Sequence, residues 1–230
     1  MNLSGYGLGM GIAPTSGNAI IFLNGNVRIG DASTVSSGTP AVAVGPSTTA
    51  SGLNSVAVGY NVASTASQSV SIGANISNGG LNSIAIGNNP TVTNQYCIAV
   101  GYQAQTTKDY SIAVGYQAQA VTNAYAVAVG YTAVAAGASS IAVGLGTTSP
   151  ANYSVAIGPG SHSSATDSIA LGYGANVAAA STDGIAIGTN TASSVGISAI
   201  SIGNAAAASN TKSIAIGASN DTRSGKRLLG

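Results

Sequence analysis

The chain has 230 residues, only 5% of them charged, and its six Lys and Arg against five acidic residues give a net charge of +1. A typical globular chain carries about 25% charged residues, and a protein this close to neutral has no long-range field for nucleic acid or an anionic membrane. The hydrophobic share of 45% comes mostly from Ala, Val and Ile. Disordered segments are rich in charge and poor in β-branched residues, so we expect a folded protein with no nucleic-acid partner.

Residues 1–26 differ from the rest of the chain. They do not open with a basic region and a long apolar block, so the sequence predicts no secretion signal, and no later apolar run is long enough to insert in a membrane. Asn24-Gly25 follows a short apolar run and predicts a hairpin turn between two strands. We expect this segment either to cap the first repeat, whose open end would expose unpaired backbone, or to attach the protein to a larger assembly.

From residue 27 to residue 217 one short motif returns at a nearly fixed interval. The motif Ser55-Val56-Ala57-Val58-Gly59 recurs fourteen residues later as residues 69–73. Its closing glycine occurs thirteen times between Gly45 and Gly217, at spacings of 14 to 16 residues, and residues 27–30 form a degenerate first copy. A period this short is typical of a solenoid, in which each repeat forms one coil and is stabilised by stacking on its neighbours.

Each motif alternates branched and small residues, which is the two-residue period of a strand. The glycine supplies the sharp turn that ends the strand, and a small or modestly apolar residue three positions later predicts a second, weaker strand that faces the same core. Coils stacked in register would form parallel sheets. We therefore predict an all-β fold, a parallel β-roll or β-solenoid of about 13–14 coils with a period of about 14 residues over residues 27–217, followed by a short tail at 218–230.

The central residue of each strand predicts how chains associate. If the two branched residues point into the coil, the residue between them points outwards, and this residue is Ala in eleven copies and Ser in two. A solvated face would accept Lys, Glu, Gln or Thr, so near-uniform Ala indicates that another chain packs against it. The predicted contact between identical chains consists of Ala43, Ala57, Ser71, Ala85, Ala99, Ala113, Ala128, Ala142, Ala156, Ala170, Ala186, Ser201 and Ala215.

Asn54-Ser55-Val56-Ala57-Val58-Gly59 and Asn82-Ser83-Ile84-Ala85-Ile86-Gly87 resemble the head-domain repeat of YadA-type trimeric autotransporter adhesins. The resemblance covers about residues 27–217. It implies a left-handed β-roll, three chains around a common axis and a role in surface adhesion. Ten copies depart from the leading Asn, so the hydrogen bonds of that Asn are not carried over to Gln68, Tyr96, Tyr110, Tyr125, Ser139, Tyr153, Asp167, Asp183, Ser198 and Lys212.

Similar repeats are also found in fibres of bacteriophages and other viruses, which assemble without a secretion signal. Only thirteen residues follow Gly217, and they contain no coiled-coil heptads, which favours the viral version. We therefore predict a homotrimeric fibre or spike on a phage tail or capsid that contributes to host attachment and joins other virion proteins through residues 1–26 or the tail. The alternatives are the head of a bacterial surface adhesin and a purely structural virion component. An ice-binding solenoid is disfavoured because Thr is scattered.

The sequence offers little for catalysis or metal binding. The five acidic residues are dispersed, and no Cys or His cluster has the spacing of a zinc site. His162 lies close to Ser161, Ser163 and Asp167, but we expect this stretch in a turn between coils, without the elbow that presents a nucleophilic serine. Cys97, the one cysteine, is expected to be a small buried residue. We predict no catalytic residue, no cofactor and no metal.

Tyrosine is the remaining candidate for recognition. In three consecutive coils one Tyr follows the motif glycine and another lies five positions before it. Equivalent positions of stacked coils are about 4.8 Å apart, so two tyrosine ladders should run side by side. Their predicted roles are a seal in the groove between subunits or an exposed surface for a host glycan or protein. The candidates are Tyr102, Tyr116 and Tyr131 after the glycine and Tyr96, Tyr110 and Tyr125 before it.

Overall fold

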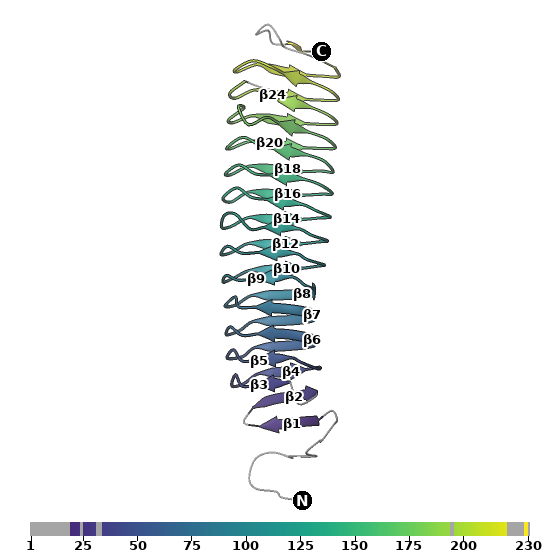
Figure 1. Cartoon of the computed structure of the whole chain (residues 1–230). Coiled ribbons are helices and arrows are strands. Elements are labelled where there is room, and N and C mark those ends of the chain that lie inside the picture. Colours follow the sequence, from purple (N-terminus) through teal and green to yellow (C-terminus); the bar gives the residue numbers. More distant parts are fainter. Residues whose placement is uncertain (1–18, 24, 31–33, 194–195, 220–227, 230) are drawn as a thin grey trace, which may run out of the picture. The chain divides into compact units, whose positions relative to one another are not determined.

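The structure is a computed structural model that describes residues 19–23, 25–30, 34–193, 196–219 and 228–229. Over these residues it contains 27 β-strands and no helix, and therefore no helix that could span a membrane. The strands belong to two compact units, Met1–Asp109 and Tyr110–Gly230, and both units repeat the same coil (Figure 1). Each coil has a first strand, which carries the motif, and a shorter second strand after the motif glycine.

In the first unit, the first strands of successive coils pair in parallel and in register: Val56 lies beside Val70, and Val70 beside Ile84. Two strands in the middle of the unit, β6 and β7, run through the glycine corner and include the second strand as well. The first strands are β2 (Asn26–Gly30), β4 (Val42–Val44), β6 (Val56–Ser64), β7 (Val70–Asn78), β8 (Ile84–Asn88) and β10 (Ile98–Val100). The separate second strands are β3 (Val35–Ser36), β5 (Thr49–Ala50), β9 (Thr91–Val92) and β11 (Gln105–Thr106).

The second unit follows the same plan, with Val127 beside Ile141 and Ile141 beside Val155. Its first strands are β12 (Ile112–Val114), β14 (Val127–Val129), β16 (Ile141–Val143), β18 (Val155–Ile157), β20 (Ile169–Leu171), β22 (Ile185–Ile187), β24 (Ile200–Ile202) and β26 (Ile214–Ile216). Its second strands are β13 (Gln119–Ala120), β15 (Val134–Ala135), β17 (Thr148–Ser149), β19 (His162–Ser163), β21 (Asn176–Val177), β23 (Ala192–Ser193) and β25 (Ala207–Ala208). The short β27 (Leu228–Leu229) lies parallel to β26.

The N-terminal hairpin is confirmed. Strand β1 (Ala19–Leu23) pairs antiparallel with β2, with Leu23 opposite Asn26, and β2 pairs in parallel with β4, as expected of a degenerate first copy. An antiparallel strand along β2 covers the edge that the first coil would otherwise expose. Most of the predicted cap or attachment segment, residues 1–18, lies outside the described residues, as does most of the predicted tail.

Two features of the backbone recur at the corners of the coils. The thirteen motif glycines have φ between 117° and 141°, and a Cβ on Gly73 would lie 1.9 Å from the carbonyl oxygen of Gly87 in the next coil. The residue five positions before the glycine has a left-handed φ of 53° to 61° in twelve coils. Asn adopts this conformation more readily than most other side chains, which explains why Asn54 and Asn82 lead their motifs. Tyr110 and Lys212 adopt the same conformation.

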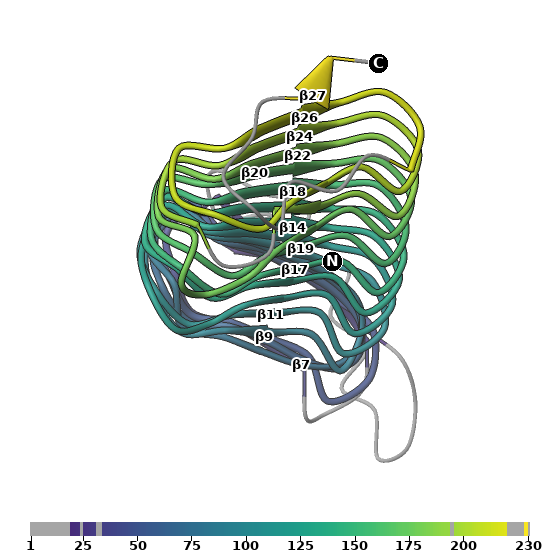
Figure 2. The ribbon, with the colours of Figure 1, turned by 90° about the horizontal axis from the view of Figure 1, so that it is seen from above.

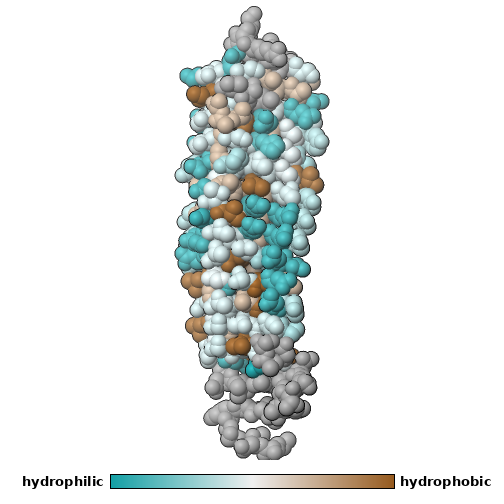
Figure 3. Space-filling model, viewed as in Figure 1, coloured by the Kyte–Doolittle hydropathy of each residue, from teal (hydrophilic) through white to brown (hydrophobic). Residues whose placement is uncertain are grey.

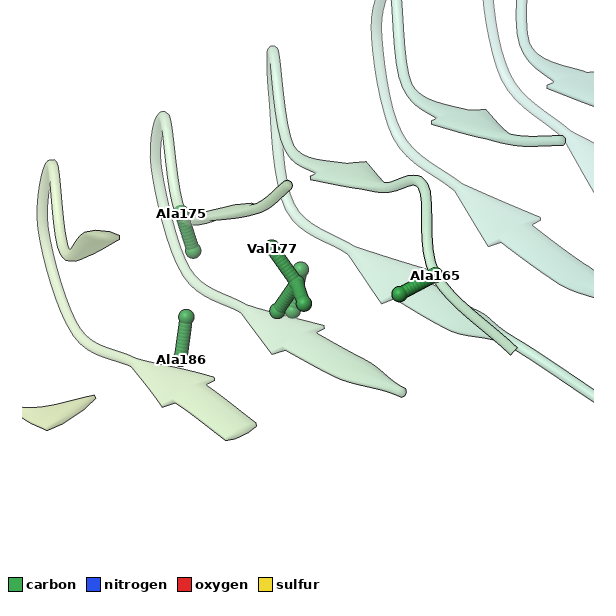
Figure 4. Close-up of a cluster of buried hydrophobic side chains, with 5 residues drawn as sticks. Ala165, Ala175, Val177 and Ala186 are labelled. Carbon is green, nitrogen blue, oxygen red and sulfur yellow. The ribbon is translucent and has the colours of Figure 1, made fainter. Parts of the chain in front are cut away.

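The interior of the roll is narrow and filled mostly by small side chains. In the coil of Gly115 the inward residues are Ser111 and Ala113 from the first strand side and Ala118 and Ala120 from the second, and all four are fully buried. Figure 2 shows that successive coils within each unit follow the same outline. Figure 4 shows the interior at Val177, where alanines from neighbouring strands point towards one another.

Polar groups inside the roll form hydrogen bonds between the two sides of a coil. The hydroxyls of Ser64 and Ser69 lie 2.7 Å apart, and Ser69 Oγ donates to the carbonyl oxygen of Ala66 at 2.6 Å. Two coils further on, Cys97 occupies the position that corresponds to Ser69. It is fully buried, and its thiol donates a hydrogen bond to the carbonyl oxygen of Lys108 at 3.0 Å. The prediction of a small buried cysteine is therefore confirmed.

The main predictions of the fold are confirmed by these observations. The chain is an all-β parallel solenoid of about 13 turns, with a period of about 14 residues. The predicted second strand exists, and the small residues three positions after the glycine, such as Ala104 and Ala118, face the core.

Candidate interaction surface

The predicted orientation of the first strand is wrong. The central residues expected to form the contact between chains point into the coil, where each has an exposed fraction of 0% within a single chain. A side chain already enclosed by its own coil has no surface left for a neighbour. The error has a physical reason: the second strand packs closely against the first, and the central position of the first strand is occupied only by the small side chains of Ala or Ser. The reversed positions are Ala43, Ala57, Ser71, Ala85, Ala99, Ala113, Ala128, Ala142, Ala156, Ala170, Ala186, Ser201 and Ala215.

The branched residues of the first strand therefore form the outer surface, here called the apolar face. Every one of these residues is Val, Ile or Leu, and every one is partly or largely exposed in the single chain. The exposed fraction reaches 40% at Ile72 and 41% at Leu171. In the first unit the apolar face consists of Val27, Ile29, Val42, Val44, Val56, Val58, Val70, Ile72, Ile84, Ile86, Ile98 and Val100. In the second unit it consists of Ile112, Val114, Val127, Val129, Ile141, Val143, Val155, Ile157, Ile169, Leu171, Ile185, Ile187, Ile200, Ile202, Ile214 and Ile216.

The outer surface of the second strand has a different composition. Its outward residues in the first unit include Thr49, Ser77, Thr91 and Gln105, and in the second unit they include Asn176. Hydroxyl and amide groups of this kind are well solvated. Figure 3 shows one side of each unit on which apolar residues lie singly or in small groups among neutral and hydrophilic ones. Only the first strand carries an unbroken apolar face.

Tyrosines flank the apolar face on both edges, as the ladders predicted from the sequence require. Tyr110 and Tyr125, five positions before their glycines, stack with ring centroids 5.0 Å apart and ring planes at 4°. Tyr116 and Tyr131, directly after the same glycines, stack at 4.9 Å and 7°. Stacking within each predicted ladder is thereby confirmed for one pair in the second unit, whereas the two ladders lie at different corners of the coil. All six candidate tyrosines are exposed in the single chain, Tyr96 and Tyr102 in the first unit included, with exposed fractions of 41% to 58%.

The residues around His162 have no catalytic arrangement. His162 lies in strand β19 rather than in the predicted turn, and its side chain points outwards, where Nδ1 contacts the hydroxyl of Thr148. The adjacent Ser161 and Ser163 are fully buried on the opposite side of the strand. Ser161 Oγ donates to the carbonyl oxygen of Gly158 at 2.9 Å, and Ser163 Oγ lies 2.7 Å from Ser168 Oγ. An outward imidazole cannot activate hydroxyls held inside the roll.

Among the described residues no three His, Cys, Asp or Glu side chains come close enough to hold a metal ion. The acidic residue with the most distinctive surroundings is Asp109, in the loop that follows β11. Asn94 Nδ2 donates to its carboxylate at 3.0 Å and Gln95 Nε2 at 3.2 Å. These two hydrogen bonds, with that of Asn94 the stronger influence, lower the pKa of the Asp109 carboxyl. The cluster is consistent with a loop that is fixed by side-chain hydrogen bonds.

Comparison with known families identifies the repeat. The model described as YadA head domain repeat (2 copies) matches residues 36–61, 98–118, 122–147, 150–175 and 194–220, which together make up more than half of the chain. Each full match spans about two coils. No curated protein matches the sequence.

Proposed function

Because the chain belongs to the family of YadA head domain repeats, we propose that it forms a homotrimeric, adhesin-like surface structure. Heads of this family are trimeric and adhesive rather than catalytic. The observation that carries the proposal for this chain is the unbroken apolar face on the first strand of every coil. Monomeric soluble proteins rarely expose contiguous apolar patches of more than a few hundred Å², so a face of this length needs another surface to cover it.

A second copy of the chain is the partner that fits the apolar face. The face repeats in every coil and its residues carry no charge, so identical chains arranged in parallel match it coil for coil. Closed rotational symmetry lets each subunit bury its face against the others around one axis, and the family likeness supports three subunits and left-handed coils. Covering Val, Ile and Leu side chains supplies roughly 25 cal/mol per Å².

The adhesive role is the second part of the proposal. A rigid trimer repeats any contact three times, so weak individual contacts with a host glycan or protein add up through avidity. The six predicted receptor tyrosines remain a proposal in this respect. Stacking covers ring faces within both ladders of the second unit, so a ligand there would meet mainly ring edges and hydroxyls.

The location of this surface structure is also a proposal. The family likeness supports the head of a bacterial trimeric adhesin, which was the alternative in the sequence analysis, better than a phage or other virion fibre. Residues 1–26 as a cap or docking segment, and the tail at 218–230 as a further contact, remain predictions. Immunogold labelling of the particles or cells that carry the protein distinguishes the two locations directly.

Two measurements on the purified protein test the proposal. Light scattering should give three times the chain mass of 22.0 kDa, and a fluorescently labelled trimer should bind intact host cells or a glycan array above the level of a denatured control. A folded monomer would contradict the assembly. A trimer that binds neither probe would contradict the adhesive role and favour a purely structural component.

A further inference from the structure

In each coil the two outward residues of the first strand lie between two corner positions, one five residues before the motif glycine and one directly after it. In the coil of Gly115 these four positions are Tyr110, Ile112, Val114 and Tyr116, whereas Ser111 and Ala113 between them are fully buried inside the roll. The two tyrosines therefore mark the two edges of the apolar face. They are six positions apart in the sequence, with five residues between them.

The two edges nevertheless carry tyrosine in the same coils. Position five before the glycine is Tyr in four coils, at Tyr96, Tyr110, Tyr125 and Tyr153. The position after the glycine is Tyr in five coils. Three coils have Tyr at both edges, and they are consecutive, with closing glycines Gly101, Gly115 and Gly130. A receptor site on one edge gives no reason for a matching residue on the other edge of the same coil.

Rotational symmetry supplies such a reason. When identical parallel chains pack around an axis with their apolar faces inwards, the leading edge of each face meets the trailing edge of the next. Equivalent coils of all subunits lie at the same height, so the residues that meet across each seam come from the same coil. A side chain at one edge then needs its partner at the opposite edge of its own coil.

The ring geometry fits a seam between chains. Tyr116 and Tyr131 cover each other's faces, as do Tyr110 and Tyr125, so each ladder presents ring edges and hydroxyl groups to its surroundings. Edges and hydroxyls of one ladder can pack and hydrogen-bond along the opposite ladder. The exposed fractions of 41% to 58% in the single chain leave surface available for this contact.

We propose that the tyrosine ladders form the seam between subunits, an inference that rests on the proposed trimer. The ladder after the glycine in one chain packs against the ladder before the glycine in the next chain, which holds the subunits in coil register. The apolar face by itself is nearly uniform along its length, so a shift by one coil would replace Val or Ile by Val or Ile. The tyrosine ladders span only three coils and therefore distinguish the correct register from a shifted one.

Chemical cross-linking tests the seam. In a background in which the buried Cys97 is replaced by Ser, the residue type found at the same position in several neighbouring coils, the double variant Y110C/Y116C is treated with a short bismaleimide. Each subunit then links to both neighbours, and covalent trimers should be the main product on a denaturing gel. The single variants Y110C and Y116C should remain monomeric on the gel, because like edges do not meet.

The matched control is the double variant Y110C/Y173C. Tyr173 lies on the same edge as Tyr116 but four coils away, about 19 Å along the roll, so this pair should give no covalent oligomer. The mass measured by light scattering before cross-linking tests the trimer separately from the tyrosine seam. A trimer in solution without Y110C/Y116C cross-links would overturn the seam and return the tyrosines to the receptor role. A covalent dimer would retain the seam but contradict threefold assembly, and a monomer would contradict both.

Discussion

The two strands of each coil have similar interiors and different exteriors. In the coil of Gly130 the inward Ala128 of the first strand and Ala135 of the second are both fully buried. Outwards, the first strand carries only Val, Ile or Leu throughout the described coils, whereas the second carries mainly Thr, Gln, Ala, Asn and Ser. Core packing cannot account for this difference, because both strands fill the same core. We infer that another chain covers the first strand and that solvent covers the second.

The largest expected effect is at the glycine corner that joins the two strands of a coil, because neither strand can keep its place if this corner is lost. In Gly73→Ala the new Cβ would lie 1.9 Å from the carbonyl oxygen of Gly87, at a φ of 140°. Neither the stacked backbone nor the φ angle accommodates this, so chemical denaturation should show a loss of at least about 3 kcal/mol in the free energy of unfolding. In the control Gly79→Ala the Cβ meets no atom within 4 Å, and the change should stay within about 0.5 kcal/mol. Equal losses would contradict the corner geometry.

A matched pair of valines tests the difference between the two exteriors. Val129 in β14 and Val134 in β15 belong to the same coil, and both point outwards and are half-buried. In the proposed trimer, Val129→Lys would place three unpaired ammonium groups in the contact between chains, at a cost of several kcal/mol. The trimer dissociation constant should therefore rise at least about 100-fold. Val134→Lys should leave it unchanged. Sedimentation over a range of concentrations measures both, and equal effects would show that the first strand has no special role.

Two buried serines test how polar groups contribute to the stability of the interior. Ser71 Oγ is buried and has no hydrogen-bond partner, and its neighbours in register are Ala57 and Ala85. Ser71→Ala should therefore raise the free energy of unfolding by about 1 kcal/mol, because it removes an unsatisfied polar atom. Ser201 Oγ accepts a hydrogen bond from the Ala208 amide at 2.8 Å, so Ser201→Ala should lower it by about 1 kcal/mol. Thermal denaturation that gives the same sign for both would contradict this account.

The period, the strand, the corner glycine and the tyrosine ladders could be predicted from the sequence because each depends on residues that recur at fixed spacing. The inner and outer faces could not be assigned by alternation, which separates Ala57 from Val56 and Val58 without saying which is buried. A signal was present on the second strand. The second strand also turns mainly small residues to the core, such as Ala104 and Ala118, so a core built from the small residues of both strands was the alternative to one filled by Val and Ile.

The smallest expected effect concerns the loop that returns from a second strand to the next first strand. Hydrogen bonds from Asn94 and Gln95 lower the pKa of Asp109 in the folded protein below the ordinary value of 3.8. The unfolded chain therefore binds this proton first as pH falls, so the contribution of Asp109 to stability is present above pH 3.8 and is lost as pH drops through the lower, folded pKa. The melting temperature of the native protein should fall slightly more over this range than that of Asp109→Asn, which keeps an acceptor for Asn94 but does not titrate. Parallel curves for the two proteins would show that these hydrogen bonds do not favour the ionised carboxylate, and the loop would then be held by its backbone alone.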